Sequence, residues 1–267
     1  MGRTPVFRAS DAPTASDRLC FIEYLETCLA VSPPRQKGLR TRERLKISTA
    51  QLLRNKGFHA LKVSDITSLA GVAEGSFYMY FRDKTDATRT VLEEFIGSYA
   101  PAMMRPSVPR SPFQSICETN RRWIALARAN AGLFRCLLQF TDGDPAFARL
   151  VEGGNRDWYM RVLNSLPGLS QPDRPVYLLM IYLLGAMMDD LLRKLVVYPD
   201  QQFRALLDSI GASDHDVVDA ASVLWMRALH GTSPDTSHLS PTVQAAAAIL
   251  HGHPPPPELG QGTGHRD

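Results

Sequence analysis

Cysteine, long apolar runs and a strong excess of one charge are all scarce in this sequence. The four cysteines show no Cys-x-x-Cys spacing, which excludes a zinc-finger or disulfide scaffold and favours free thiols. They are Cys20, Cys28, Cys117 and Cys136. The longest apolar run, residues 176–188, is shorter than the roughly 20 residues that cross a bilayer, and residues 1–16 contain no apolar signal core. We therefore expect a cytoplasmic protein with no membrane partner.

Recognisable catalytic patterns are also missing. The sequence has no evident Ser/His/Asp or Cys/His set and no glycine-rich phosphate loop. Asp189 and Asp190 lie in an apolar segment, as in the aspartate-rich metal helices of all-α prenyl-transfer enzymes. Here, however, Arg193 and Lys194 follow in place of a further carboxylate. The sequence therefore predicts no enzyme, no cofactor and no metal centre.

Apolar residues, by contrast, are plentiful enough for a sizeable core: 44% of the 267 residues are hydrophobic and 21% are charged. Val, Ile and Thr form no alternating runs, so an all-α fold is predicted. Helical spacing and Pro, Gly or Asp/Ser boundaries predict helices over residues 17–30, 39–56, 64–70, 73–81, 84–103, 113–130, 131–140, 145–166, 173–197 and 214–229. Residues 231–267 are predicted to be a largely disordered tail.

Positive charge is concentrated in one segment. Residues 35–89 contain twelve Lys/Arg and five Asp/Glu, a net charge of +7, which leaves −4 for the rest of a chain whose total is +3. A basic segment on a mildly acidic body indicates a polyanion partner for that segment alone. The alternative is a solvated, Lys/Arg-rich helix face.

Residues 63–84 have the pattern of a helix-turn-helix. Ser64 is placed to cap the first short helix, Ala70 is small enough to let a second helix approach, and Gly71 supplies the left-handed turn. The positions predicted to face inward are Ile66, Leu69, Val72, Phe77 and Phe81. Such a unit inserts the start of its second helix into a DNA major groove.

This segment resembles the tetracycline-repressor (TetR) family of bacterial regulators. The resemblance covers residues 39–94 and is carried by Ala70-Gly71-Val72, by Gly75-Ser76-Phe77-Tyr78-x-Tyr80-Phe81 and by Lys84. It implies a symmetric dimer in which an N-terminal three-helix helix-turn-helix domain precedes a helical ligand-binding body. The implied division is an N-terminal extension (1–36) with a short helix, a DNA-binding domain (37–86), an effector-binding and dimerisation domain (87–230) and the tail (231–267).

The resemblance also implies which residues contact DNA. Hydroxyl and ammonium groups donate to phosphate oxygens, and the implied backbone contacts are Ser64, Ser76, Tyr78, Tyr80 and Lys84. Glu74, Gly75 and Met79 are placed to read base edges, and Arg40 and Arg42 to reach a nearby phosphate or minor groove. The structural alternatives are that the ring of Tyr78 packs in the protein and that Lys84 only begins the next helix.

One position departs from the family pattern. Many members have Ser or Thr where this chain has Ala73, and alanine loses a helix cap worth about 1 kcal/mol. Glu74 follows, and its carboxylate would repel phosphate unless it accepts a hydrogen bond from a cytosine amino group. Its alternative role is a favourable interaction with the helix N-terminus.

Two predicted helices of the larger body, residues 173–197 and 214–229, are apolar over more than one stripe. This indicates partners beyond their own chain. The resemblance assigns them to a four-helix dimer interface, whose predicted residues are Met180, Leu184, Leu191, Leu195, Val218, Ala221, Leu224 and Trp225. The alternative is that both helices form the central core of one chain.

A largely apolar effector pocket is also predicted in the body. The predicted wall residues are Trp123, Phe134, Leu138, Trp158, Tyr159, Tyr177 and Met187, and the polar anchors are Arg122, Asn155, Asp189 and Asp190. We expect a homodimeric repressor that a small apolar effector releases from a palindromic double-stranded operator. The alternative is a regulator that responds to a protein partner or to no ligand, with the additional helix at 17–30 as one surface for recruitment.

Overall fold

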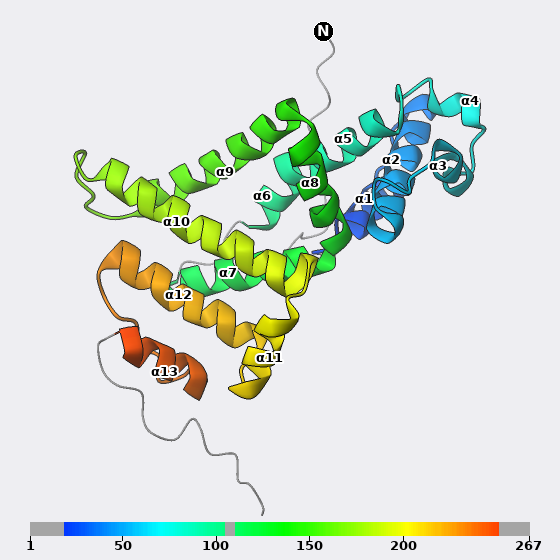
Figure 1. Ribbon diagram of the computed structural model, residues 1–267. Coiled ribbons are helices and arrows are strands. Elements are labelled where there is room, and N and C mark those ends of the chain that lie inside the picture. Colours follow the sequence, from blue (N-terminus) through cyan, green and yellow to red (C-terminus); the bar gives the residue numbers. More distant parts are fainter. Residues whose placement is uncertain (1–18, 105–109, 251–267) are drawn as a thin grey trace, which may run out of the picture. The chain divides into compact units, whose positions relative to one another are not determined.

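The computed structural model describes residues 19–104 and 110–250, and every regular element in this part of the chain is a helix (Figure 1). The predicted all-α fold is therefore confirmed. The described residues form two compact units. Unit 1 contains the residues up to 104 together with Ala129–Phe147, and unit 2 contains the remainder.

Unit 1 is built around one long basic helix. Its elements are α1 (Phe21–Val31), α2 (Lys37–Lys56), α3 (Val63–Ala70), α4 (Glu74–Phe77), α5 (Lys84–Glu94), the π-helical turn η1 (Phe95–Tyr99), α6 (Ala100–Met103) and α8 (Ala131–Gly143). Helix α2 ends at Gly57, whose φ of 73° favours glycine and whose N–H donates to the carbonyl of Leu53 at 3.0 Å. The predicted stop is confirmed.

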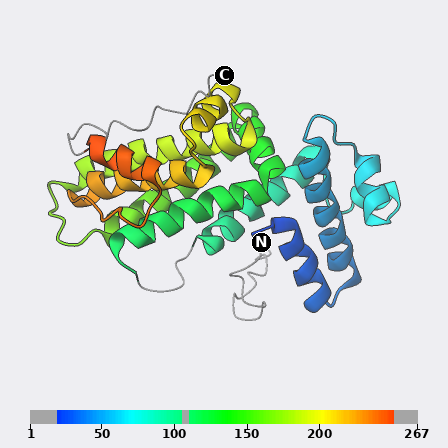
Figure 2. The same ribbon diagram turned by 90° about the horizontal axis from the view of Figure 1, so that it is seen from below.

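Helix α1 is tied to unit 1 at its N-terminus. The Phe21 ring lies 5.4 Å from that of Phe95 and 5.0 Å from that of Tyr99, and all three are buried. The Asn130 amide accepts from the Phe21 N–H at 2.9 Å and donates to the Leu19 carbonyl at 2.6 Å. Figures 1 and 2 both show α1 alongside α2. Of the predicted helix 17–30, residues 17 and 18 lie outside the described part.

A buried cation joins α2 to the end of α5. Lys46 is only 4% exposed. Its Nζ lies 2.5 Å from a carboxylate oxygen of Glu43 and 2.6 Å from one of Glu94. Since a buried charge is costly unless it is paired, these two contacts explain how a lysine fits inside the unit.

Helix α8 packs closely on α2, and this corrects the predicted domain division. A Cβ added at Gly132 would lie 2.5 Å from the Arg54 carbonyl oxygen, so the two backbones approach as only glycine permits. The Phe140 ring lies edge-on to that of Phe58 at 4.7 Å. Residues 87–230, predicted as one body, therefore do not form one compact unit, because these contacts place α5 and α8 with the N-terminal helices.

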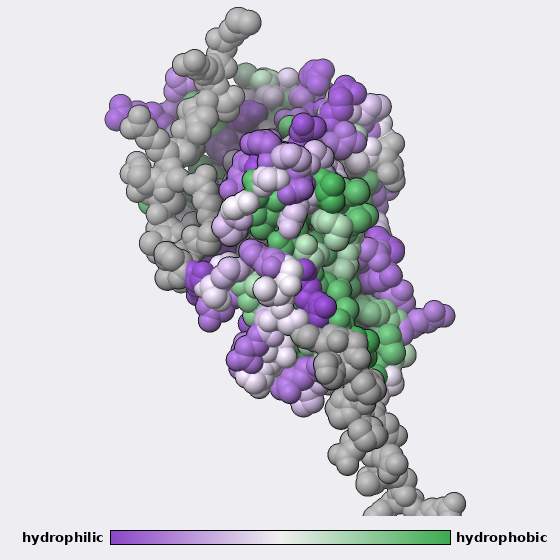
Figure 3. Space-filling view, turned by 90° about the vertical axis from the view of Figure 1, so that its left-hand side faces the viewer, coloured by the Kyte–Doolittle hydropathy of each residue, from purple (hydrophilic) through white to green (hydrophobic). Residues whose placement is uncertain are grey.

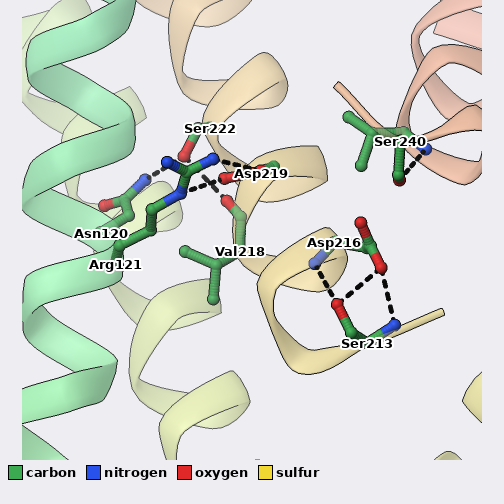
Figure 4. A network of polar contacts seen from close by, with 9 residues as sticks. Asn120, Arg121, Ser213, Asp216, Val218, Asp219, Ser222 and Ser240 are labelled. Carbon is green, nitrogen blue, oxygen red and sulfur yellow. Dashed lines mark hydrogen bonds and ion pairs between the residues drawn. The ribbon is translucent and has the colours of Figure 1, made fainter. Parts of the chain in front are cut away.

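Unit 2 contains most of α9 (Pro145–Ser165) and all but the last residue of α7 (Pro112–Ala129). Its other elements are α10 (Arg174–Leu192) with the π-helical turn η2 (Arg193–Val197), α11 (Gln201–Ser209), α12 (Asp214–His230) and α13 (Pro241–Leu250). Helices α7 and α12 are joined by a polar network (Figure 4). In it, Arg121 Nε donates to Asp219 at 2.7 Å, and the Asn120 amide donates to Ser222 at 3.0 Å.

Helix α12 begins with a side-chain cap. The Ser213 hydroxyl accepts from the Asp216 N–H at 3.3 Å, and the Asp216 carboxylate accepts from the Ser213 N–H at 2.7 Å, which completes a capping box (Figure 4). Figure 2 shows α13 beside α12.

Two helices were not predicted. Helix α11 is nine residues long, and Asp200 caps it by accepting from the N–H groups of Gln202 and Phe203. Helix α13 contradicts the predicted disorder of 231–267, because Val243 and Ala247 are buried in a cluster with Phe113 and Cys117 of α7 and Val223 of α12. Residues 251–267 lie outside the described part.

The segment Arg174–Val197 of α10 and η2 is long and apolar enough to cross a membrane by length and composition. From the sequence, the apolar run 176–188 was expected to be too short to cross a membrane. The helix is longer than that run because it continues through Asp189 and Asp190. One such helix is weak evidence, since a core helix of a folded protein passes the same test. Here α10 packs against α12 inside unit 2.

Candidate nucleic-acid interface

Helices α3 and α4 are joined by a tight left-handed turn. Gly71 has φ 63° and ψ 45°, and its N–H donates to the Ser68 carbonyl at 3.2 Å. The Val72 N–H donates to the Thr67 carbonyl at 3.0 Å. Both hydrogen bonds satisfy carbonyl groups at the end of α3, as a glycine-terminated helix requires. The predicted role of Gly71 is confirmed.

The inner side of this pair is aromatic. Phe77 is 0% exposed and Phe81 is 2% exposed, with ring centroids 5.5 Å apart, and Ile66 is also fully buried. Val72 is half-buried. The prediction for Leu69 is wrong: this side chain is 52% exposed, and it lines a surface hollow together with Leu29 of α1.

The predicted cap at Ser64 is also wrong. Helix α3 begins one residue earlier, at Val63, so the cap position falls on Lys62, whose carbonyl accepts from the Ile66 N–H at 3.2 Å. Ser64 is instead an exposed residue of the first turn. Its hydroxyl is accessible to a phosphate.

The outer side of α4 and the turn after it is accessible. Met79 is 77% exposed and Tyr78 is 58% exposed. Ser76 and Tyr80 are half-buried, and Glu74 and Gly75 are exposed. The Tyr78 ring also packs edge-on against Phe77 at 5.5 Å. The structural alternative for Tyr78 thus holds in part, because its ring packs on Phe77 while most of the residue stays exposed.

Helix α4 begins without a side-chain cap, as the alanine at this position predicts. Ala73 is the N-cap residue, and its carbonyl accepts from the Ser76 N–H at 2.9 Å. Glu74 occupies the first turn, where a carboxylate interacts favourably with the helix N-terminus. The helix spans Glu74–Phe77 and continues as a turn to Phe81, so it is shorter than the predicted 73–81.

Lys84 has a structural role that competes with its predicted DNA contact. Its Nζ donates to the carbonyls of Leu61 at 3.0 Å and of Phe58 and His59 at 3.4 Å. It also lies 4.9 Å from the centre of the Phe58 ring. Lys84 is the first residue of α5, which Asp83 caps. The ammonium group thereby ties α5 to the loop between α2 and α3.

Three arginines of α2 support the motif. Arg40 Nη1 donates to the carbonyls of Pro34 at 3.0 Å and Arg35 at 2.9 Å, so it fixes the start of α2. The Arg42 guanidinium lies 5.3 Å from the centre of the Phe81 ring.

Arg44, which the sequence interpretation missed, donates to the Ala70 carbonyl at the end of α3. The two residues are 26 positions apart in sequence, so no local sequence pattern predicts this hydrogen bond.

Two helices that meet at a left-handed glycine and pack on a third long helix define a helix-turn-helix domain. Residues 48–86 match the sequence model described as "Bacterial regulatory proteins, tetR family". Over this domain the chain is similar to the TetR family.

Two curated proteins of Bacillus subtilis (strain 168) are similar to this chain. They are the uncharacterized HTH-type transcriptional regulator YdgC, 36% identical over 61 residues, and the fatty acid metabolism regulator protein, 32% identical over 56 residues. The alignments cover 23% and 21% of this chain and only 31% and 29% of the two relatives. Both relatives are named as regulators, not as enzymes.

Among solved structures, the fatty acid degradation regulator FadR from Bacillus halodurans is similar at a TM-score of 0.46 and 16% identity, over 71% of this chain and 94% of that one.

The predicted effector-pocket residues fall in both units. Phe134 and Leu138 belong to α8 of unit 1, where Phe134 is buried against Phe95 at 5.4 Å. The remaining ones belong to unit 2: Arg122, Trp123, Asn155, Trp158, Tyr159, Tyr177, Met187, Asp189 and Asp190. Asn155 is exposed on α9.

Asp190 does not have the surroundings of a pocket anchor. It lies 2.8 Å from Arg193 and 2.8 Å from Lys194 on the same helical segment. Hydrogen bonds from Lys194 and Arg193 lower the pKa of this carboxyl below its ordinary value. The predicted anchor is therefore a surface ion pair.

Most of the predicted dimer residues are buried within their own chain. Leu184, Leu195, Val218, Ala221 and Trp225 are at most 8% exposed, whereas Met180, Leu191 and Leu224 are half-buried. The core alternative thus describes these five residues. Apolar surface is nevertheless open to solvent on the face that Figure 3 shows. The exposed apolar side chains of α10 are Val176, Leu179, Tyr182 and Leu183.

Proposed function

We propose that this chain is a DNA-binding transcriptional regulator that acts as a homodimeric repressor in the cytoplasm. The single observation that carries the proposal is the exposed outer side of the turn after α4. There Tyr78 and Met79 protrude from a helix-turn-helix whose inner side is closed by Phe77. In this arrangement the protruding side chains are available to a duplex without any cost in core packing.

The proposed DNA contacts follow the accessibility of each side chain. Ser64, Ser76, Tyr78 and Tyr80 donate hydroxyl hydrogen bonds to phosphates. Glu74, Gly75 and Met79 face base edges, with Glu74 accepting from a cytosine amino group. Arg40, Arg42 and Lys84 add positive charge at the edge of the site while they hold its elements together.

The proposed dimer forms through the exposed side of α10, which replaces the buried residues predicted from sequence. Val176, Leu179 and Leu183 are each at least 57% exposed, and residues 175–188 contain no charged side chain. A face of this kind is self-complementary about a two-fold axis. A two-fold dimer reads a palindromic operator whose half-sites are about one helical turn apart, or a multiple of that.

A small apolar effector is the proposed signal, and it acts only through a different affinity for the DNA-binding and released arrangements. The name of one relative, a fatty acid metabolism regulator, is compatible with an apolar effector. That alignment covers 29% of the relative, so it supports a shared DNA-binding domain rather than a shared effector.

Control by a protein partner, or by no ligand, is the second candidate. The observation in its favour is the tight packing of α9 on α10: a Cβ added at Gly185 would lie 2.5 Å from the Tyr159 hydroxyl. Tyr159 is 7% exposed, and burial raises its pKa to about 12. Its ring fills space that an effector would need. A ligand-induced rise in melting temperature would favour the effector.

The test is binding to a duplex selected from a random-sequence library, measured by fluorescence anisotropy over a range of salt concentrations. Tyr78→Phe removes one hydroxyl and keeps the ring, so we expect two- to tenfold weaker binding, about 0.5–1.5 kcal/mol, with unchanged stability. Tyr198→Phe, at a 45% exposed tyrosine that follows η2 in unit 2, is the matched control and should bind as the wild type does. Failure of the wild type to bind any duplex at low ionic strength would refute the proposal.

A further inference from the structure

Two adjoining hollows lie on unit 1 between α1, α2 and α3. The larger has a volume of about 410 Å³ and the smaller about 330 Å³, and both are lined by Leu29 of α1 and Arg44 of α2. We call the two hollows together the α1–α3 groove. The side chains that define its character are Leu29, Lys37, Arg40, Arg44, Ile47 and Leu69.

The floor of the α1–α3 groove is apolar and comes from all three helices. Leu29 and Ile47 line it together with Leu69, which is 52% exposed despite its place in the folded helix-turn-helix. A large apolar side chain left open beside two others is unfavourable in water. Covering this floor with apolar side chains would therefore be favourable.

The rim is charged at one end. Lys37, Arg40 and Arg44 line the groove where α2 begins. At the other end the Glu26 carboxylate accepts from the Gln51 amide at 2.6 Å, so the named lining side chains carry three positive charges and one negative charge. The net charge that the groove presents to an occupant is positive.

We propose that the α1–α3 groove binds an acidic amphipathic helix of a partner protein. Helix-in-groove recognition places the apolar stripe of the guest on the apolar floor, and carboxylates beside that stripe would meet the three cations. The groove is an open depression, whereas small-molecule sites enclose most of the ligand surface. A DNA backbone satisfies the cations but leaves the leucine floor without a partner.

Helix α1 makes this surface possible. It supplies Leu29 and lies on α2, held by Phe21 among Phe95 and Tyr99 and by the hydrogen bonds of Asn130. The surface therefore depends on a helix that precedes the part of the chain matched by the family model, 48–86. Its occupant would be a second partner, distinct from the operator.

The test uses the full chain and a fluorescein-labelled peptide of Leu, Ala and Glu, about 20 residues long because isolated helices of about 12–15 residues are marginal in water. Anisotropy should report saturable binding, and an analogue with Lys in place of every Glu should not bind. Leu69→Ser should weaken binding of the acidic peptide at least about tenfold. Lys37→Glu should have a similar effect, because it reverses one charge of the rim.

Leu206→Ser is the matched control, since Leu206 is 53% exposed on α11 of unit 2. It should leave peptide binding unchanged, and none of the variants should change the helical circular dichroism signal. Equal affinity for the wild type and Leu69→Ser, or no saturable binding, would overturn the proposal. Absence of peptide binding together with weaker duplex binding by Leu69→Ser would assign the groove to DNA instead. Retention of duplex binding by the wild type in the same assay separates this outcome from failure of the proposed function.

Discussion

The helix-turn-helix of unit 1 and helix α10 of unit 2 expose different kinds of surface. In the first, Phe77 is fully buried and its neighbour Tyr78, which carries a hydroxyl, is 58% exposed. In the second, Val176, Leu179 and Leu183 are exposed side by side at helical spacing. An exposed tyrosine hydroxyl beside a buried ring can donate a hydrogen bond to a hydrated, charged ligand such as DNA. An uncharged row of exposed apolar side chains favours contact with another apolar surface.

The largest effect is expected from a substitution in the core of the helix-turn-helix. Phe77→Ala should destabilise unit 1 by about 3–5 kcal/mol, because a fully buried ring is replaced by a cavity. Met79→Ala, two positions on at a 77% exposed side chain, should change stability by no more than about 0.5 kcal/mol.

Urea unfolding monitored by circular dichroism gives both values. Similar losses in the two variants would show that the inner side of α4 and the outer side of the turn after it are not distinct.

A charge on the exposed side of α10 tests the second surface. Leu183→Asp should prevent dimer formation, because each protomer loses an apolar contact of about 1.5–3 kcal/mol and gains a carboxylate that must be desolvated. Sedimentation velocity should then show monomers, with weaker binding to a palindromic duplex.

Leu206→Asp, at a leucine of similar exposure on α11, should remain dimeric. Persistence of dimers in Leu183→Asp would rule out this face as the interface.

The smallest effect concerns helix caps within unit 1. Asp83 caps α5 by accepting from the Asp86 N–H at 2.9 Å, whereas Ala73 begins α4 with no side chain that can accept. Ala73→Ser should therefore add up to about 1 kcal/mol of stability, and Asp83→Ala should remove about 1 kcal/mol. Thermal unfolding should move in opposite directions for the two variants; a shift in the same direction would contradict the role given to the caps.

The local pattern around Gly71 predicted much of the helix-turn-helix. The glycine turn, the buried Phe77 and Phe81 and the uncapped start at Ala73 all depend on residues within one or two turns of each other. The prediction was wrong at Ser64 and Leu69, where a shift of one residue in the helix start and the position of α1 decided the outcome.

Contacts between distant residues account for what the sequence interpretation missed in unit 1. Arg44 reaches the Ala70 carbonyl across 26 positions, and Lys84 reaches the Leu61 carbonyl across 23. A basic residue in a sequence looks the same whether it faces solvent, a phosphate or a helix end. Its partner is fixed only when the helices pack.

Helix α13 shows the same limit in unit 2. Its small apolar residues follow a Ser/Thr/Pro-rich stretch that is typical of a disordered tail. It is helical because Val243 and Ala247 are buried with Phe113 of α7 and Val223 of α12. Most helical stability comes from tertiary packing of an apolar face. The helix could therefore not be predicted without the residues of α7 and α12 against which that face packs.

Sequence alone determined the all-α class and the helix-turn-helix, because hydrophobic period, turn glycines and buried aromatics act over a few residues. Tertiary structure decided which leucines of α10 remain exposed, which cations hold helix ends and how α1 forms a groove with α2 and α3. These features depend on packing between segments far apart in the chain, where burial and pairing are settled by geometry rather than by composition.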